Sequence, residues 1–168
     1  RSSGRGRVVD AAIVDIVAML GSIAQRIHGR GLLGGDAPSP FHDSPFYDVY
    51  RCADGGCITL GALEPQFYVL LLEKLGLSDV DRRKQYDHRT WPALKERLTA
   101  LFASQPRAHW EALLEGTDVC FAPVLSLEEA VQHPHNLARG IYRRSETGAM
   151  QVAAAPRFLG LGHDDSFD

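Results

Sequence analysis

The chain has 168 residues, of which 45% are hydrophobic and 23% charged, a composition typical of a soluble globular protein. Eighteen Lys and Arg against 21 Asp and Glu give a formal net charge of −3, and the absence of a basic block argues against nucleic-acid binding. No apolar run approaches the roughly 18 residues that a membrane span requires, because Asp10 and Asp15 interrupt the most apolar stretch.

The N-terminal residues and the cysteines predict the setting of the chain. Residues 1–7 lack the apolar centre of a signal peptide, and the missing initiator Met predicts a fragment. Cys52, Cys57 and Cys120 are too few and too scattered for a disulfide framework, and their odd number favours a reducing compartment. We therefore expect a cytoplasmic protein.

Residues 8–28 predict one long, heavily buried helix. Apolar side chains recur there at steps of three and four: Val9, Ala12, Ile13, Ile16, Val17, Leu20, Ile23, Ala24 and Ile27. The pattern stops at His28, and an irregular, solvent-facing stretch rich in glycine and proline continues to Pro45. Because so long a connection is unusual inside a compact domain, we place a domain boundary in it.

Residues 46–52 and 57–62 predict a β-hairpin. They are separated by Ala53-Asp54-Gly55-Gly56, and Asp-Gly is typical of a type I′ turn. With Asp54 and Gly55 at the centre of the turn, Cys52 lies opposite Cys57 and the two side chains share a face. Such a pair is compatible with two small packed residues, with a redox pair or with a metal clip.

The second half of the chain predicts short helices between short strands. Pro65 suits the first turn of a helix and Gly76 its end, which makes Glu64 the N-cap. Further helices are expected over 90–102, 106–115 and, from the capping box at residues 126–129, up to about Pro134, with strands over 119–124, 141–144 and 150–153. Since strands and helices do not alternate regularly, the fold class is α+β.

The common short site motifs are absent or weak. His133 and His135 could contribute to a zinc site, but no Cys-x-x-Cys or His-Glu-x-x-His accompanies them, which favours a polar helix end. No phosphate-binding glycine loop and no Gly-x-Ser-x-Gly elbow occurs. We therefore expect no metal site.

Glu64 is the side chain that the sequence places most favourably for function. It lies where a strand ends and a helix begins, between Gly61 and Pro65, so that rigid elements present its carboxylate at an edge. The alternative is that Glu64 only caps the helix and gains about 0.3–1 kcal/mol from the helix dipole. The residues alone leave both interpretations open.

Several stretches, in order along nearly the whole chain, resemble the α-methylacyl-CoA racemases of the family III CoA transferases. The most specific is Gly61-Ala62-Leu63-Glu64-Pro65-Gln66-Phe67-Tyr68. The others are Gly4-Arg5-Gly6-Arg7-Val8-Val9-Asp10-Ala11-Ala12, Phe46-Tyr47-Asp48-Val49-Tyr50, Gly116-Thr117-Asp118-Val119-Cys120-Phe121-Ala122-Pro123-Val124-Leu125, His133-Pro134-His135-Asn136, Arg139-Gly140 and Ala155-Pro156-Arg157-Phe158.

The resemblance implies an enzyme of fatty acid metabolism that inverts the carbon next to an acyl-CoA thioester. A proton is removed on one face and returned on the other, and no cofactor is needed. In the family the two acid/base groups are a His and an Asp of the large domain, and we expect both to lie before the first residue of this chain. The chain alone is then expected to be inactive.

The resemblance also assigns roles to residues of this chain. Glu64 resembles the carboxylate that holds the catalytic His, and is the candidate catalytic residue; Tyr47, Gly61 and Leu63 fall on substrate-binding positions. Residues 1–44 would be the last large-domain helix and a linker, 45–155 a small α+β domain, and 156–168 a C-terminal tail. Family members are interlocked homodimers, so the expected partners are an acyl-CoA thioester and a second subunit.

Two alternatives remain at this stage. A CoA transferase of the same family would use an upstream Asp as nucleophile. A non-catalytic dimerising or acyl-CoA-binding module would use the broad apolar face of residues 8–28. The linker also departs from the family pattern at residues 30–38, and residues 39–44 are extra, which puts the preferred acyl chain in doubt.

Overall fold

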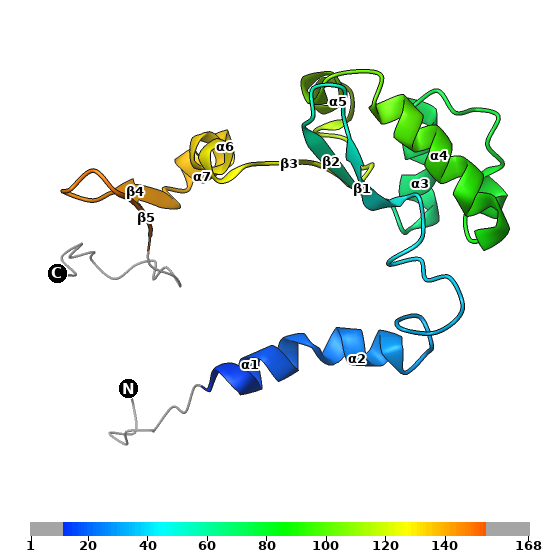
Figure 1. The fold of residues 1–168 in the computed structure, drawn as a ribbon, viewed down its shortest axis with the longest axis horizontal. Coiled ribbons are helices and arrows are strands. Elements are labelled where there is room, and N and C mark those ends of the chain that lie inside the picture. The colour runs from blue at the N-terminus through cyan, green and yellow to red at the C-terminus, as the bar shows by residue number, and fades with distance from the viewer. Residues whose placement is uncertain (1–11, 154–168) are drawn as a thin grey trace, which may run out of the picture. The chain divides into compact units, whose positions relative to one another are not determined.

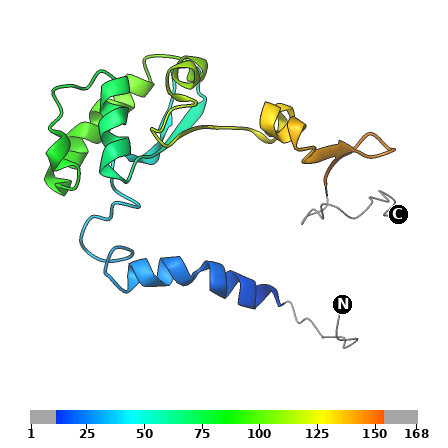
Figure 2. The ribbon, with the colours of Figure 1, turned by 180° about the vertical axis from the view of Figure 1, so that it is seen from behind.

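The computed structural model describes residues 12–153. The chain divides into two compact units, the first reaching Val124 and the second beginning at Leu125. The first unit contains a three-stranded sheet and, next to it, the helices α3 (Pro65–Lys74), α4 (Trp91–Phe102) and α5 (Arg107–Leu114) (Figures 1 and 2). Helices and short antiparallel strands together confirm the α+β fold class.

The sheet joins two segments that lie far apart in the sequence. Strands β1 (Tyr47–Arg51) and β2 (Cys57–Gly61) form the predicted hairpin, and β3 (Phe121–Val124) pairs antiparallel with the other side of β2. The strand order is therefore β1-β2-β3. This pairing places the end of β2 beside the beginning of β3, where Leu60 faces Phe121.

The hairpin register differs from the predicted one by one residue. Arg51, not Cys52, is the partner of Cys57, and Cys52 N–H donates to the Gly56 carbonyl at 2.8 Å. Gly55 has a φ of 83° and Asp54 is not in the left-handed region, so the turn is a three-residue loop with a glycine bulge instead of type I′. Since neighbours along a strand point to opposite faces, Cys52 and Cys57 do not share a face, and that prediction is wrong.

The hydrophobic core lies on one face of the sheet. Tyr50, Ile58 and Leu60 alternate toward it, and helices α3, α4 and α5 contribute the rest. The helical core residues with the least exposure are Leu71, Leu98, Phe102 and Leu114. On the other face Tyr47, Val49 and Val124 are exposed.

The predicted helix ends are confirmed because local signals fix them. Pro65 occupies the first turn of α3, and Gly76 and Gly116, with φ of 68° and 75°, follow α3 and α5. Two short 3₁₀ turns that the sequence pattern did not predict, η1 (Arg82–Lys84) and η2 (His88–Thr90), join α3 to α4.

The predicted long helix is two shorter ones, α1 (Ile13–Leu20) and α2 (Ser22–His28). They meet at Gly21. Among the amino acids, only proline has a lower helix propensity than glycine. Neither helix contains a buried residue, and Ile13 and Leu20 are 80% and 70% exposed, so the described part of the chain does not supply the burial that we expected. Residues 8–11 of the predicted helix lie outside the described residues.

The linker has a folded end. Ser39 and Ser44 are buried, and their hydroxyls donate to the carbonyls of Leu32 and Pro40. Ser39 N–H also donates to the Asp43 carboxylate at 2.8 Å. This stretch is irregular, as predicted, but it is not solvent-facing throughout.

The second unit begins with the predicted capping box, in which Ser126 and Glu129 exchange hydrogen bonds at the start of α6 (Leu127–Gln132). A further short helix, α7 (Pro134–Ala138), precedes the predicted pair β4 (Tyr142–Arg144) and β5 (Met150–Val152). Among the helices of residues 12–153, none has the length and apolarity needed to cross a membrane.

Candidate functional site

The site is built where β2 ends and α3 begins. Leu63 N–H donates to the Gly61 carbonyl at 2.8 Å, which turns the chain sharply. Ala62 is fully buried, and its N–H donates to the Phe46 carbonyl at 2.9 Å. The backbone just before Glu64 is thus fixed from inside the domain, while Glu64 itself is exposed.

Glu64 occupies the N-cap position of α3 without capping it through its side chain. Its backbone is extended (φ −74°, ψ 139°), and its carbonyl accepts from the N–H groups of Phe67 and Tyr68, each at 3.1 Å. The carboxylate makes no capping hydrogen bond. The side chain therefore contributes no hydrogen bond to the helix end, and its carboxylate lies at the surface.

Two residues between η1 and η2 hold the turn in place. The Gln85 amide nitrogen donates to the carbonyls of Ala62 and Leu63 at 3.1 and 2.9 Å, and the Tyr86 hydroxyl donates to the same Leu63 carbonyl. No sequence pattern indicated either residue, because a contact over 22 or 23 positions leaves no local signal. Side chains from one loop thus bind the two peptide groups that precede Glu64.

Aromatic side chains pack against this loop. The Phe46 ring lies edge-on to the rings of Tyr68, Tyr86 and Trp91, with centroids 5.2, 5.7 and 5.8 Å away. The Trp91 indole N–H donates to the Gln85 carbonyl at 2.7 Å. Burial together with the Asp81 charge raises the pKa of Tyr68 to about 12, so this ring stays neutral within the cluster.

A groove of about 510 Å³ runs across the open face of the sheet beside this turn. Tyr47 and Gly61 are cross-strand partners and both line it, so the structure brings together two of the predicted substrate-binding residues. Leu63 is only partly buried and packs against the core, outside the residues that line the groove. The remaining lining residues are Phe41, His42, Asp48, Val49, Thr59, Leu60, Cys120, Phe121 and Ala122.

Cys120 is a third residue of the site that no sequence pattern indicated. It has a φ of 54°, a left-handed conformation that non-glycine residues rarely adopt and that tends to occur at functional sites. Its carbonyl accepts from Gly61 N–H at 2.8 Å. Partial burial and the Glu64 carboxylate raise the pKa of its thiol, and burial and the same carboxylate raise the pKa of the Tyr86 hydroxyl. Glu64 therefore acts on both neighbours through its charge.

The described residues contain no cluster of three His, Cys, Asp or Glu side chains able to hold a metal ion. His133 is the C-cap of α6, a helix end as the sequence favoured, but Pro134, which was expected to end a helix, begins α7, and His135 lies within α7.

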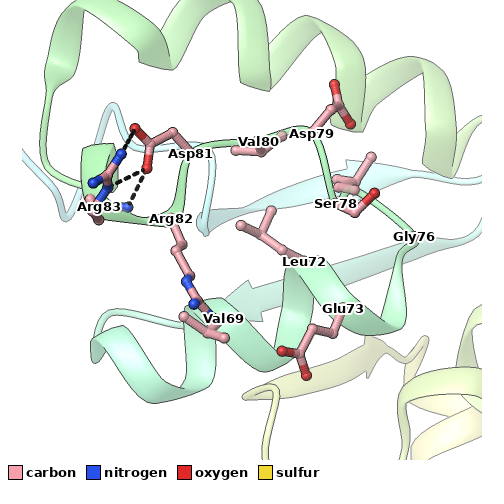
Figure 3. A pocket seen from close by; sticks show the side chains of 11 residues that line it. Val69, Leu72, Glu73, Gly76, Ser78, Asp79, Val80, Asp81, Arg82 and Arg83 are labelled. Carbon is pink, nitrogen blue, oxygen red and sulfur yellow. Dashed lines mark hydrogen bonds and ion pairs between the residues drawn. The ribbon is translucent and has the colours of Figure 1, made fainter.

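A second hollow, of about 580 Å³, lies between α3 and residues 76–83 (Figure 3). Glu73 and Asp79 line it together with Arg82, and Arg83 is held by Asp81 through an ion pair of 3.1 Å. Its charges are mixed, and none of the predicted site residues lines it. It is therefore not part of the site around Glu64.

Comparison with known proteins identifies the family. The profile of CoA-transferase family III matches residues 1–163. The chain belongs to this family. Alpha-methylacyl-CoA racemase of Homo sapiens is 36% identical over 98% of this chain, and that of Mus musculus is 39% identical over 83%.

The fold of this chain is also found in a solved structure. The chain superposes on the Rv3272 protein of Mycobacterium tuberculosis with a TM-score of 0.68 over 95% of its length, at 18% sequence identity. It spans 44% of the human racemase and 42% of the Rv3272 chain. The predicted membership of the racemase and CoA-transferase group is confirmed.

Proposed function

We propose that this chain is part of an acyl-CoA racemase that inverts the α-carbon of 2-methylacyl-CoA thioesters. The proposal rests on the exposed carboxylate of Glu64, which lies at the start of α3 and makes no capping hydrogen bond. The chain that carries it is 36% identical to human alpha-methylacyl-CoA racemase. A carboxylate that rigid elements present, and that makes no hydrogen bond to its own helix, is suited to hold a partner group in one orientation.

The reaction needs a base on one face of the α-carbon and an acid on the other. The base takes the α-proton, the electron pair of the C–H bond moves into an enolate on the thioester oxygen, and the acid returns a proton on the opposite face. The resemblance implies that a His and an Asp from outside this chain play these roles. The charge of Glu64 would stabilise the imidazolium form of that His and fix its orientation.

The groove beside Glu64 would receive the acyl portion of the substrate. In its lining, Tyr47 supplies an aromatic surface and Gly61, which has no side chain, leaves space. An apolar substrate group requires such surface and space. Leu63 belongs to the same proposal as a residue at the rim of the turn. No cofactor enters the proposed reaction.

We propose a homodimer because α1 exposes its apolar side chains. All of its residues except Asp15 are apolar, and Ile13, Val17 and Leu20 are 80%, 61% and 70% exposed, whereas so apolar a helix is typical of a position covered by other parts of a protein. We propose that the complete protein or its second subunit covers it, with a domain boundary near residue 44. A cytoplasmic location belongs to the same proposal, and cell fractionation tests it.

A CoA transferase is the second candidate, because the matching family profile carries that name. Exchange of the α-proton of a 2-methylacyl-CoA with deuterium from D2O distinguishes the two. The proposal predicts exchange by the complete gene product and none by residues 1–168 alone. Transfer of CoA to a carboxylate acceptor without α-proton exchange would overturn the racemase proposal. Exchange by the 168-residue chain alone would overturn the claim that the acid and the base lie outside this chain.

A further inference from the structure

Gln85 is a buried polar residue whose burial the core itself does not explain. Its side chain is 4% exposed, and within the described residues its amide oxygen has no hydrogen-bond partner. A buried polar atom without a partner costs free energy, so an apolar residue of similar size would suit this place better if packing alone mattered. The value of a glutamine here must come from its amide nitrogen.

That nitrogen binds the peptide groups next to Glu64. Its two hydrogen bonds, at 3.1 and 2.9 Å, go to the consecutive carbonyls of Ala62 and Leu63. The Tyr86 hydroxyl donates to the Leu63 carbonyl as well. The peptide that links Leu63 to Glu64 is thus held by two side chains at once.

Both donor residues contact aromatic residues of the core, although the Tyr86 side chain is 52% exposed. The Trp91 indole N–H donates to the backbone carbonyl of Gln85 at 2.7 Å, and Phe46 packs edge-on against both Trp91 and Tyr86. Phe46 also accepts a hydrogen bond from Ala62 N–H at 2.9 Å. The turn is therefore held by the Gln85 and Tyr86 side chains and by the Phe46 backbone.

We propose that Gln85 and Tyr86 are positioning residues that orient Glu64 for its part in catalysis. The inference rests on the proposed function, since it requires Glu64 to take part in the reaction. Glu64 has an extended backbone and no cap that would fix its carboxylate. Its direction then depends on the preceding peptide, and a shift of about 1 Å at a catalytic group can cost on the order of 100-fold in rate.

The test uses the complete gene product and measures α-proton exchange with a 2-methylacyl-CoA. Gln85→Met removes both amide donors with little change in volume, and Tyr86→Phe removes one hydroxyl. Both are expected to lower kcat, by on the order of 10- to 100-fold for Gln85→Met and less for Tyr86→Phe, with KM nearly unchanged.

Tyr50→Phe is the matched control for Tyr86→Phe. It also removes one hydroxyl that donates to a backbone carbonyl, that of Pro45 at 2.5 Å, but at a buried place that does not touch the turn. We expect it to lower stability and to leave kcat unchanged. If Tyr50→Phe and Tyr86→Phe change kcat equally, hydrogen-bond loss acts through general stability and the inference is wrong.

A double substitution separates the inference from the proposed function. If Gln85 acts through Glu64, adding Gln85→Met to Glu64→Gln causes no further loss of kcat, whereas independent effects multiply. If Glu64→Gln alone has no effect, the proposed role of Glu64 fails. If Glu64→Gln lowers kcat while Gln85→Met and Tyr86→Phe do not, only the positioning inference fails. Tyr86→Phe decides the question if Gln85→Met does not fold.

Discussion

Gly61 N–H donates to the Cys120 carbonyl at 2.8 Å, and a Cβ placed on Gly61 would lie 3.6 Å from the Cβ of Cys120. This hydrogen bond extends the pairing of β2 with β3 by one residue, to the point where the chain turns toward Glu64. The Cys120 thiol and the groove therefore lie at the same edge of the sheet as the Glu64 carboxylate. Substitutions at this edge can test the thiol and the groove separately.

Cys120 should report the charge of Glu64. The carboxylate helps to raise the pKa of the Cys120 thiol, so Glu64→Gln should lower that pKa. Because the thiolate is the reactive form, alkylation of Cys120 below its pKa should become faster in this variant. Mass spectrometry after iodoacetamide treatment separates it from buried Cys52, which serves as the internal control. An unchanged Cys120 rate would show that the carboxylate does not act on this thiol.

Gly61 should control entry into the groove. A Cβ there makes only ordinary contacts with Cys120 and with the Tyr47 ring at 3.9 Å, so a larger residue is accommodated by the fold but occupies the groove. We expect Gly61→Leu to keep the free energy of unfolding within about 0.5 kcal/mol and to raise the Kd for acyl-CoA by on the order of tenfold. Arg51→Leu, on the same face but outside the groove lining, is the control. Equal effects of both variants on Kd would argue against an acyl site here.

The hairpin turn gives a stability prediction. Gly55 has a φ of 83°, which costs a residue with a Cβ about 1–2 kcal/mol. Gly55→Ala should lower the free energy of unfolding by that amount, as measured by urea denaturation, and Gly55→Asn should lower it less. Asp54→Asn should be milder, because the Asp54 backbone is not left-handed and its side-chain oxygen accepts from Gly56 N–H at 3.1 Å. A neutral Gly55→Ala would contradict the bulged turn.

Asp87 gives a prediction for pH. A side-chain hydrogen bond from Arg89 lowers the pKa of Asp87 to about 2, below the roughly 3.9 of an unfolded chain. A depressed carboxyl pKa stabilises the folded state above pH of about 4, and this contribution is lost as the pH falls toward 2. NMR titration of the Asp87 carboxyl should give the low value, and Arg89→Gln should return it toward 3.9. A wild-type value already near 3.9 would contradict the ion pair.

Local signals predicted much of this fold, and long-range contacts account for what they missed. Pro65 and Gly76 fix the ends of α3 wherever that helix packs, so its bounds could be foreseen. The hairpin could be foreseen as well, but its register depended on whether Asp54, in addition to Gly55, takes a positive φ, and a one-residue difference moves Cys52 to the other face.

The site divides in the same way. Glu64 stands out in the sequence because a strand meets a helix there, and Tyr47 and Gly61 follow from the resemblance. Gln85 and Tyr86 reach the turn across 22 or 23 residues, a contact that only the folded chain reveals. The exposed α1 likewise shows that an apolar pattern predicts the need for a partner but not where the partner comes from.

The most direct test is the rate of α-proton exchange by the complete gene product carrying Glu64→Gln. This change keeps the size of the side chain and removes the charge that would stabilise the imidazolium. Because the side chain makes no capping hydrogen bond, folding should be preserved, with the free energy of unfolding changed by less than about 0.5 kcal/mol. We expect this folded variant to lose kcat on the order of 100-fold. Exchange at the wild-type rate would contradict it.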